Sequence, residues 1–544
     1  FIHYIDIDWP DLFRPILTTK TNFFNRIRIR REVIPIIFVP GMMGSRLKRG
    51  KEIVWDPDRE IMCMLLKYGG FWNTPAQRKK MLIGEKFDPG YLQVSEDDTK
   101  HNKMFTSEAD PGRESRGWGG VYWGAYGGLL EELQDYNWNK PVSSDDKDKK
   151  KELAGKCFEF PVHAFGYNWT DSNYNSGKNL ANKIEEIIDG YKTKERLCKY
   201  VILVTHSMGG LVARSACVLH GAQDNVLGVI HGVQPAVGAA AAYWRMKAGF
   251  ERTGIASTIS AWVLGTNGEE VTCILGNAPG GLELLPTKDY TQNDGGKQWL
   301  HITLQDGKEI SLPQYDPYSE IYRIGENINI ATQKKDASFW RLVNPDWLDP
   351  KNSGKIPDSH DPANHFKEPW DEYVKCLDKA CALHEGLKTR IHNSTYQFYS
   401  SGISTVDKIT FKHEEFLFRK QYAFGTGYSE PASRASFRGE STMFADMNHQ
   451  EIASTLPQPQ KTFVACMCKV SDFREGGDGT VPESSGSALR GDGSIIISGM
   501  RKYDHQDVYK KREARDFIVT AIRNLALKLI IEKVKEGYVD TAKW

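Results

Sequence analysis

The residues best suited to do chemistry surround Ser207. This serine lies in Thr205-His-Ser-Met-Gly209, directly after the apolar run Val201–Val204 and directly before a segment with helical spacing. A strand, a sharp turn and a helix form a nucleophile elbow, in which small residues two before and two after the serine let neighbouring backbones pass close to the strained turn. Thr205 stands where the usual pattern has glycine, a mild departure because threonine is short. We expect Ser207 to be a nucleophile; the alternative is a serine that only caps the helix.

Two further residues have the types and the chain order that a serine nucleophile needs. Asp478 lies in Gly476-Gly-Asp-Gly-Thr-Val-Pro482, and His505 lies in Tyr503-Asp-His-Gln-Asp507, 27 residues after the aspartate. The order serine, acid, histidine is that of α/β-hydrolases. The histidine would take the proton of Ser207 and return it to a leaving alcohol, while the aspartate would fix the tautomer of the histidine.

Other carboxylates and histidines compete for these two roles. Asp472 precedes the glycine turn, and Asp504 and Asp507 belong to the histidine loop itself. His449 lies before the acid and breaks the order, and His206 is expected to point away from the nucleophile across the turn and to be structural. Asp478 and His505 are therefore preferred as the acid and the base.

A glycine-containing turn earlier in the chain predicts an oxyanion hole. Residues 34–39 have the pattern of a buried strand, and Pro40-Gly-Met-Met-Gly-Ser-Arg-Leu47 follows directly. In a hydrolase such a turn can aim the N–H of Met42 at the negative charge that develops on a carbonyl oxygen, with the N–H of Met208 as the second donor. The alternative is an ordinary connection between a strand and a helix.

Strand-like and helical segments alternate around these residues. Apolar runs typical of buried strands occur at 34–39, 160–169, 201–204 and 226–232, and helical spacing occurs at 119–133, 177–191 and 211–219. Such alternation is typical of a mostly parallel sheet flanked by helices. We therefore predict the α/β class and, with the nucleophile motif, an α/β-hydrolase fold with a large inserted cap or lid domain.

The distance between Ser207 and Asp478 predicts the domain organisation. It is far longer than one strand–helix repeat, so a cap must be inserted there. Strand-like runs at 394–399 and 462–470 are expected to return the chain to the sheet. The predicted divisions are an N-terminal extension at 1–32, a first part of the hydrolase core at 33–236 with an insertion at 48–117, a cap or lid at 237–460, the last part of the core at 461–535 and a C-terminal tail at 536–544.

A nearly uncharged segment at 255–264 is a candidate lid. A mobile apolar lid of this kind would open at a lipid surface, and a buried cap helix is an equal alternative. The candidate lid residues are Ile255, Ile259, Trp262, Val263 and Leu264.

The composition argues against two classes of protein, those that bind nucleic acid and those that span a membrane. The 544 residues include 71 basic and 70 acidic side chains, a formal net charge of +1. There is thus no global basic field for a polyanion, and no nucleic acid is expected as a partner. Mean hydropathy is −0.50, and no window approaches the roughly 18 apolar residues of a membrane span.

The cysteines and the first residue of the chain are relevant to the compartment in which the protein is made. Nine cysteines show no paired zinc-ligand spacing. Cys376 and Cys381 are near enough to be bridged, but an odd and scattered set fits a reducing compartment of synthesis. The chain begins at Phe1 rather than Met, so an N-terminal piece is expected to be missing, and a removed targeting segment stays open.

The motifs together resemble known lipases. The set at 39–47, 205–210 and 477–482, with a histidine downstream, looks like the lipase branch that includes lecithin:cholesterol acyltransferase and the GPI-inositol deacylase relatives. More closely, Gly228-Val-Ile-His-Gly-Val-Gln-Pro235, Asn277-Ala-Pro-Gly-Gly-Leu-Glu-Leu-Leu-Pro286 and Tyr503-Asp-His-Gln-Asp507 resemble bacterial type VI secretion phospholipase effectors of the third or fourth lipase class. The similarity covers most of residues 33–530.

This resemblance implies an antibacterial toxin that hydrolyses acyl esters of membrane glycerophospholipids. It implies synthesis in the producer cytoplasm, secretion through contacts with a type VI apparatus, action at the membrane surface in the recipient periplasm, and a cognate immunity protein. The mechanism needs no metal or organic cofactor, although acidic loops leave a structural Ca²⁺ in the cap open. The alternatives are a lipid deacylase or acyltransferase with the same triad, and a non-catalytic binding protein on a hydrolase fold.

Overall fold

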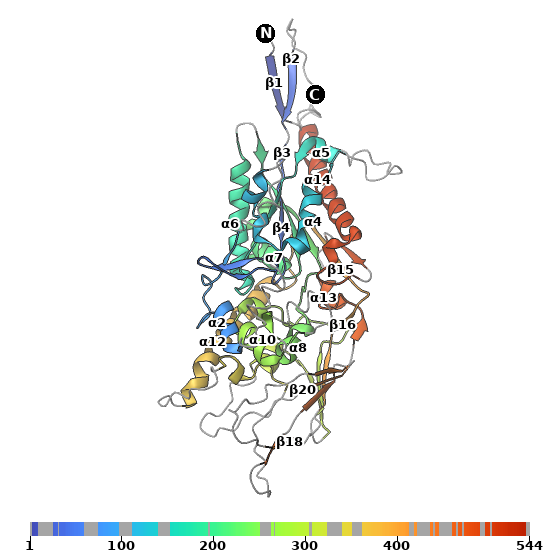
Figure 1. Cartoon of the computed structure of the whole chain (residues 1–544). Helices are drawn as coiled ribbons and strands as arrows, with labels where there is room; N and C mark the ends of the chain where they lie inside the picture. Colours follow the sequence, from blue (N-terminus) through green and yellow to red (C-terminus); the bar gives the residue numbers. More distant parts are fainter. Residues whose placement is uncertain are drawn as a thin grey trace.

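The structure is a computed structural model of the chain. It describes residues 3–8, 25–30, 32–58, 74–96, 111–139, 153–193, 196–250, 263–265, 267–303, 307–323, 340–350, 362–412, 418–421, 436–438, 441–444, 460–463, 466–469, 473–489, 495–500 and 503–539. Figure 1 shows an elongated molecule, with the sheet and its flanking helices between the N-terminal strands at one end and further helices and strands at the other.

A parallel sheet forms the centre of the molecule. In the part of the chain that the structure describes, its strands lie in the order β24-β15-β12-β11-β4-β9, and every neighbouring pair is parallel. The strands are β4 (Ile36–Val39), β9 (Val162–Ala164), β11 (Val201–His206), β12 (Val226–Gly232), β15 (Thr395–Ser400) and β24 (Ile495–Met500).

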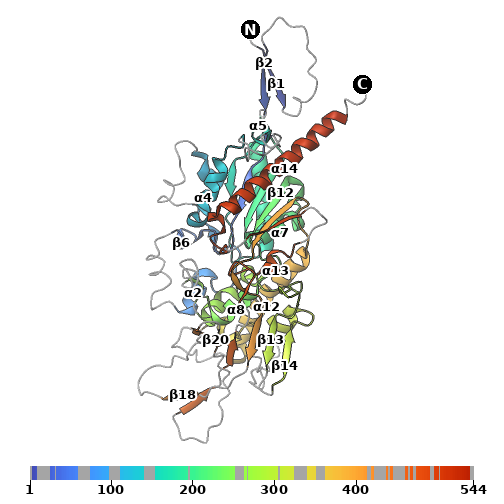
Figure 2. The same cartoon turned by 90° about the vertical axis from the view of Figure 1, so that its right-hand side faces the viewer.

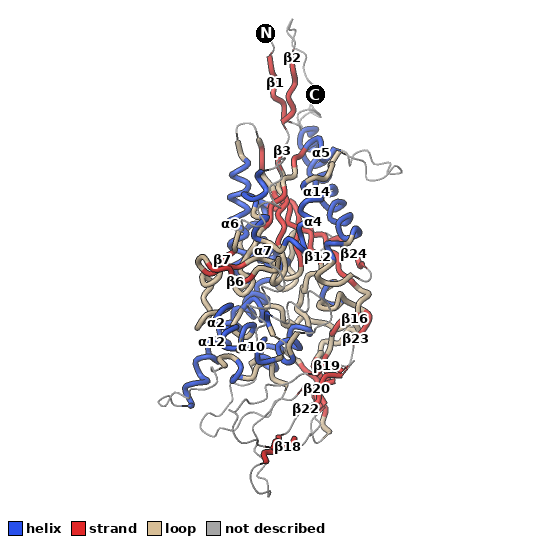
Figure 3. The backbone as a smooth tube through the Cα atoms, in the orientation of Figure 1, coloured by secondary structure: helices blue, strands red, loops and turns tan. Residues whose placement is uncertain are grey.

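Helices cover both faces of this sheet, which explains its continuous apolar strands. In β11, Val201 and Leu203 belong to one buried core, whereas Ile202 and Val204 belong to the core on the opposite face. A strand buried on both faces needs apolar side chains at successive positions, because neighbouring side chains point in opposite directions. Figure 2 and Figure 3 show the strands between two helical layers. The layers are α6 (Asn173–Tyr191) and α7 (Gly209–Leu219) on one face, and α4 (Trp123–Gln134) and α14 (Arg512–Val539) on the other.

α6 shows how the sequence sets such a helix. The hydroxyl of its N-cap residue, Ser172, accepts a hydrogen bond from the Tyr174 N–H. Leu180, Ile184 and Ile188 then recur at a spacing of four and are buried against the sheet. A capped start and an apolar stripe at this period are what a helix needs to pack on one face of a sheet. The predicted α/β class, a parallel sheet flanked by helices, is confirmed.

Of the two predicted returns of the chain to the central sheet, the one at 394–399 is confirmed, because β15 lies there. β15 lies inside 237–460, the range predicted as cap, yet it pairs with β12 and β24. The predicted return at 462–470 is wrong, because β22 (Cys466–Lys469) pairs with β17 (Ile409–Lys412) and β20 (Ser441–Phe444) in another sheet. The strand pattern is the same in both runs, and periodicity does not reveal which strand will be the neighbour. The other domain boundaries stay predictions.

The remaining elements surround this core. Before β12 they are β1 (His3–Asp8), β2 (Asn25–Arg30), β3 (Glu32–Val33), β5 (Leu47–Arg49), β6 (Glu52–Trp55), α2 (Pro75–Leu82), β7 (Gln93–Val94), α5 (Leu153–Cys157), β8 (Phe158–Glu159) and β10 (Leu197–Cys198). After β12 they are α8 (Ala240–Ala248), α10 (Gly268–Leu275), α11 (Pro279–Leu282), β13 (Leu300–Thr303), β14 (Glu309–Leu312), α12 (Pro362–Leu387), β16 (Ser404–Val406), β18 (Phe418–Gln421), β19 (Ser436–Arg438), β21 (Gln460–Phe463), β23 (Phe473–Glu475) and α13 (Glu483–Gly486). None of the described helices has the length and apolar character needed to cross a bilayer.

A buried ion pair fixes the segment that follows the predicted oxyanion turn. Arg46 Nη2 lies 3.0 Å from Asp56 Oδ2, and both side chains are fully buried. Arg46 Nη1 also donates to the Gly119 carbonyl over 2.8 Å. One guanidinium therefore joins the residue before β5, the residue after β6 and the turn that precedes α4.

Removing one partner of this pair should destabilise the protein strongly. We expect Asp56→Ala to lower the free energy of unfolding by about 3–5 kcal/mol, because a buried guanidinium would lose its counter-charge. Urea denaturation followed by fluorescence measures the change. As the matched control, Glu186→Ala breaks an exposed pair with Lys183 and should cost less than about 1 kcal/mol. Equal losses in the two variants would contradict the assignment of the buried pair as a structural anchor.

Candidate active site

The nucleophile elbow lies between β11 and α7. β11 ends at His206, α7 begins at Gly209, and Ser207 has a φ of 51°. This left-handed conformation is rare for a residue with a side chain and is typical of functional turns. A Cβ on Gly209 would lie 2.4 Å from the Pro40 carbonyl oxygen. Glycine is therefore required there, because the backbone after β4 passes against the first turn of α7.

Thr205 shows how the departure from the usual elbow pattern is accommodated. It is fully buried, and its hydroxyl oxygen lies 2.9 Å from Nδ1 of His231 on the neighbouring strand β12. Burial lowers the pKa of His231 to about 3, so this imidazole is neutral. The side chain of Thr205 is thus used for a contact between two strands and does not obstruct the turn.

The structure brings the three predicted catalytic residues together. Ser207 Oγ lies 2.8 Å from His505 Nε2, and His505 Nδ1 lies 2.7 Å from Asp478 Oδ2. All three are buried, with exposed fractions of 8%, 7% and 2% for the serine, the histidine and the aspartate. Their order along this line of contacts is that of a nucleophile, its base and the acid that orients the base.

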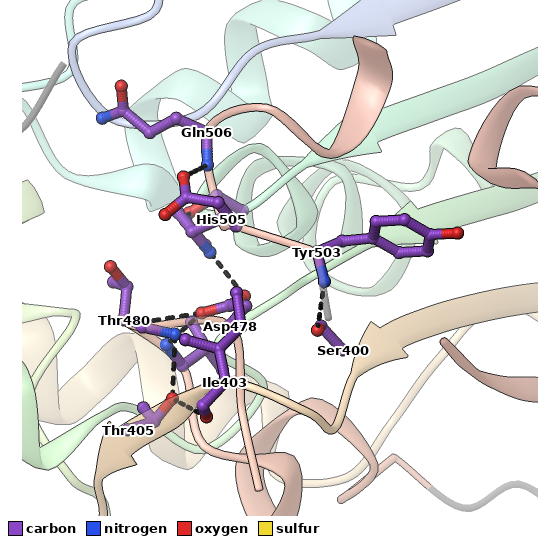
Figure 4. Close-up of polar contacts among 12 residues, drawn as sticks. Ser400, Ile403, Thr405, Asp478, Thr480, Tyr503, His505 and Gln506 are labelled. Carbon is purple, nitrogen blue, oxygen red and sulfur yellow. Dashed lines mark hydrogen bonds and ion pairs between the residues drawn. The ribbon is translucent and has the colours of Figure 1, made fainter. Parts of the chain in front are cut away.

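The loop that carries the acid is held from two directions. Asp478 Oδ1 accepts hydrogen bonds from the N–H groups of Thr480 and Val481 at 2.9 and 2.7 Å. The next residue, Gly479, has a φ of 87° and donates its N–H to Thr405 Oγ1 at 2.8 Å. In Figure 4, Asp478 lies between His505 and the segment containing Thr405. The carboxylate is thereby fixed in direction as well as in place.

Sequence reasoning missed Thr405 and Ser400 as supports of the site. Both lie inside the range predicted as cap. Ser400 ends β15 and its hydroxyl accepts the Tyr503 N–H, two residues before His505. Nothing in the local sequence around these two residues distinguishes them from ordinary strand residues, because their role depends on partners far along the chain.

The predicted oxyanion donors lie at the turns beside the nucleophile. Met208 is buried at the start of α7, and Met42 is partly buried in a turn closed by a hydrogen bond from the Gly44 N–H to the Gly41 carbonyl. Within the described ranges, neither methionine N–H has a protein acceptor. Their role as oxyanion donors remains a prediction.

Gly41, in the same turn, lies close to the nucleophile. A Cβ at this position would lie 2.9 Å from Ser207 Cβ and 2.8 Å from His206 Nδ1. We expect Gly41→Ala to lower kcat/KM for an ester substrate by about 10–100-fold, since displacement of catalytic groups by about 1 Å costs up to this much. Steady-state kinetics measures the loss. Gly190→Ala, where the added methyl meets nothing within 4 Å, is the control, and similar kinetics for the two variants would contradict the prediction.

The competing residues are placed elsewhere or lie outside the described residues. His206 is buried, and its ring nitrogens contact Tyr126 and the His505 backbone, in agreement with the structural role predicted for it. Asp504 is exposed and accepts the Gln506 N–H. Asp472 and His449 lie outside the described residues.

The candidate lid is described only at its end. Ile255, Ile259 and Trp262 lie outside the described residues, and a lid role for them stays a prediction. Val263 and Leu264 are buried, and the Arg78 guanidinium on α2 donates to the Val263 carbonyl over 3.1 Å. For these two residues the packing favours the alternative, a segment buried in the cap.

The thiols and the acidic residues define no further centre in the described ranges. Cys376 and Cys381 are both free, so the bridge considered between them is not formed. No group of three or more His, Cys, Asp or Glu side chains that could hold a metal ion occurs among the described residues. The expectation that no cofactor is required stays a prediction.

The parallel sheet, the nucleophile elbow after β11 and the acid and histidine loops at the carboxyl ends of later strands define the chain as an α/β-hydrolase. The model of the PGAP1-like alpha/beta domain matches residues 164–247, which include the elbow. Along nearly its whole length the chain is similar to a chain in "The crystal structure of Tle4-Tli4 complex", with 25% identity and a TM-score of 0.64, over 91% of this chain and 99% of that chain.

Two further comparisons give less information about the relatives of this chain. Lipase BlEst2 of Bacillus licheniformis, in its mature form, matches 28% of this chain and 62% of its own with 21% identity. Its TM-score of 0.16 is too low for a comparison of the two folds. No curated protein matches the sequence.

These similarities confirm the resemblance to type VI secretion lipase effectors. The chain is a lipase-like α/β-hydrolase related to Tle4, and the esterase type of enzyme follows from that relationship.

Proposed function

We propose that the chain is a serine phospholipase that cleaves acyl ester bonds of membrane glycerophospholipids as a type VI secreted antibacterial effector. The observation that carries the proposal is the continuous contact from Ser207 Oγ through His505 to Asp478, at 2.8 and 2.7 Å. It occurs in a chain similar to a lipase effector over 91% of its length.

The proposed reaction follows from this geometry. His505 Nε2 takes the proton of the Ser207 hydroxyl as Oγ attacks the acyl carbonyl carbon, and the carbonyl oxygen becomes an oxyanion that accepts hydrogen bonds from the Met42 and Met208 N–H groups. Collapse of this intermediate breaks the ester bond, and the imidazolium returns the proton to the leaving lysophospholipid hydroxyl. Water then attacks the acyl-enzyme with the same base, which releases the fatty acid and regenerates the serine.

The class of substrate and the partners rest on the similarity. The related structure is a complex of Tle4 with Tli4. We propose a corresponding immunity partner for this chain, export by contact with a type VI apparatus, and action at the membrane surface in a recipient periplasm. The alternatives named from the sequence, an acyltransferase or another lipid deacylase, would use the same attack on an acyl ester and differ in the acceptor or the lipid.

The test is product analysis with phospholipid vesicles. The purified chain is mixed with vesicles of phosphatidylethanolamine and phosphatidylglycerol whose two acyl chains differ, and products are resolved by mass. We expect one fatty acid and one lysophospholipid in equal amounts, and no release after a fluorophosphonate has modified Ser207. Added short alcohol distinguishes an acyltransferase, which would form the alkyl ester. Absence of release, even with detergent, would overturn the phospholipase proposal.

A further inference from the structure

A continuous set of buried hydrogen bonds lies beneath the nucleophile and is not part of the Ser207–His505–Asp478 line. The Tyr126 hydroxyl lies 3.4 Å from the Gly41 N–H and 2.9 Å from His206 Nδ1. His206 Nε2 lies 2.8 Å from the carbonyl oxygen of His505. The side chains of Tyr126 and His206 are only 3% and 4% exposed, so water does not compete for these contacts.

The direction of each hydrogen bond follows from the chemistry of its partners. A carbonyl oxygen only accepts, so His206 Nε2 must carry the proton that reaches His505. Burial, helped by the nearby His505, lowers the pKa of His206 to about 3. The ring is therefore neutral, and Nδ1 accepts. The Tyr126 hydroxyl must then donate to Nδ1, and its oxygen can accept the Gly41 N–H.

Aromatic packing holds these two side chains in place. The Tyr126 ring centroid lies 4.7 Å from that of Phe38 on β4, and the His206 centroid lies 5.4 Å from that of Tyr509. Tyr509 also donates its hydroxyl to the Thr205 carbonyl over 2.6 Å. Rings packed in this way from four segments of the chain leave a hydroxyl and an imidazole little freedom to change partners.

The two ends of this set of hydrogen bonds lie at the two groups that the proposed reaction uses besides the nucleophile: the oxyanion turn and the base. At one end, Gly41 precedes Met42, the predicted oxyanion donor. At the other end is the backbone of the base, whose N–H is already held by the Asp478 carbonyl at 3.0 Å. With its carbonyl held by His206, His505 is fixed at both of its backbone groups as well as at both ring nitrogens.

We propose that Tyr126 and His206 are positioning residues. Through one buried hydrogen-bonded link they fix the position of the base relative to the oxyanion turn. The contacts that define this role are those with Gly41, with the His505 backbone and with each other. This inference rests on the proposed function, because it assigns a role in an acyl-transfer reaction.

Substitutions that remove single hydrogen bonds test the link. His206→Phe keeps the ring and loses the donor to His505, whereas His206→Gln can restore it with a side-chain N–H. We expect His206→Phe to lower kcat by about 10–100-fold with KM changed less than about twofold, as for a misplaced catalytic group. His206→Gln should recover most of this loss, and Tyr126→Phe should lower kcat by about 3–10-fold.

The control and the readout separate positioning from general loss of structure. Tyr122→Phe makes the same change near the start of α4, with its ring 6.3 Å from that of Tyr126, and should behave as the parent. Kinetics are measured on a soluble p-nitrophenyl ester below the melting temperature of each variant. Parental kcat in His206→Phe, a His206→Gln variant as slow as His206→Phe, or a loss confined to KM would overturn the proposal.

A second readout keeps this inference separate from the substrate. The rate at which a fluorophosphonate labels Ser207 depends on the base and on the oxyanion turn but not on the natural lipid. Slower labelling of His206→Phe than of Tyr122→Phe supports the positioning role even if no phospholipid is cleaved. Equal labelling rates in parent, His206→Phe and Tyr126→Phe would contradict it, even if phospholipid is cleaved.

Discussion

Replacing Ser207 with alanine is expected to lower kcat for ester hydrolysis by about 10⁶-fold, the magnitude found when a serine nucleophile is removed from a triad. The loss is large because, in the part of the chain that the structure describes, Ser207 is the hydroxyl held against the base. His505 Nε2 is 2.8 Å from Ser207 Oγ, and without that oxygen no covalent intermediate can form. The rate that remains would come from the oxyanion donors and from substrate binding.

Ser215→Ala provides the matched control for this prediction. Ser215 is a buried residue of α7, eight positions after the nucleophile, and among the described residues its hydroxyl has no hydrogen-bond partner. Removing it should leave kcat unchanged and stability near that of the parent. Fatty-acid release by both variants, with melting temperatures to verify folding, gives the comparison. A Ser207→Ala protein that kept more than a few per cent of parental activity would exclude the proposed nucleophile.

Asp478→Asn should have the next largest effect, about a 10⁴-fold loss in kcat, the magnitude known for this change in a serine protease triad. Asp478 Oδ1 accepts two backbone N–H groups, and the amide oxygen of an asparagine would keep those bonds. Its NH₂ group would then face His505 Nδ1, which must accept. The imidazole proton would be forced onto Nε2, the nitrogen that has to take the proton of Ser207.

The structure also supplies the control for the aspartate. Asp504 is an exposed carboxylate one residue before the base, and its Oδ1 accepts only a local N–H, that of Gln506, among the described contacts. Asp504→Asn should therefore leave kcat and the melting temperature unchanged. We expect Asp478→Asn to unfold near the parental temperature, because the shape and the two backbone hydrogen bonds are kept and the third is kept with its direction reversed. A comparable loss of activity in the two variants would contradict the assignment of the acid.

The sequence was informative wherever one short segment contains its own constraints. The elbow requires a strand, a strained serine and a glycine within ten residues, so Ser207 and Gly209 could be identified from local pattern alone. The order of serine, acid and histidine then selected Asp478 and His505, which the structure places in contact. Helices such as α6 were also predictable, because their caps and apolar stripes are local.

Contacts between distant segments could not be predicted in the same way. β15 and β22 have similar strand patterns, yet one completes the central sheet and the other pairs with β17 and β20. Thr405 and Tyr126 support the site only through partners more than 70 positions away. A single sequence specifies which faces are apolar, but the choice of partner is decided by the packing of the whole chain.

The separation of Ser207 from His505, 298 positions, has a consequence for how the protein is made. At about 5–20 residues per second of synthesis, the nucleophile emerges about 15–60 s before the histidine. Contacts between such distant positions also form slowly after release, because a long loop must close first. A nascent chain therefore passes through a period in which its elbow can fold but has no base. The complete site can form only after translation has passed β24, the last strand of the sheet.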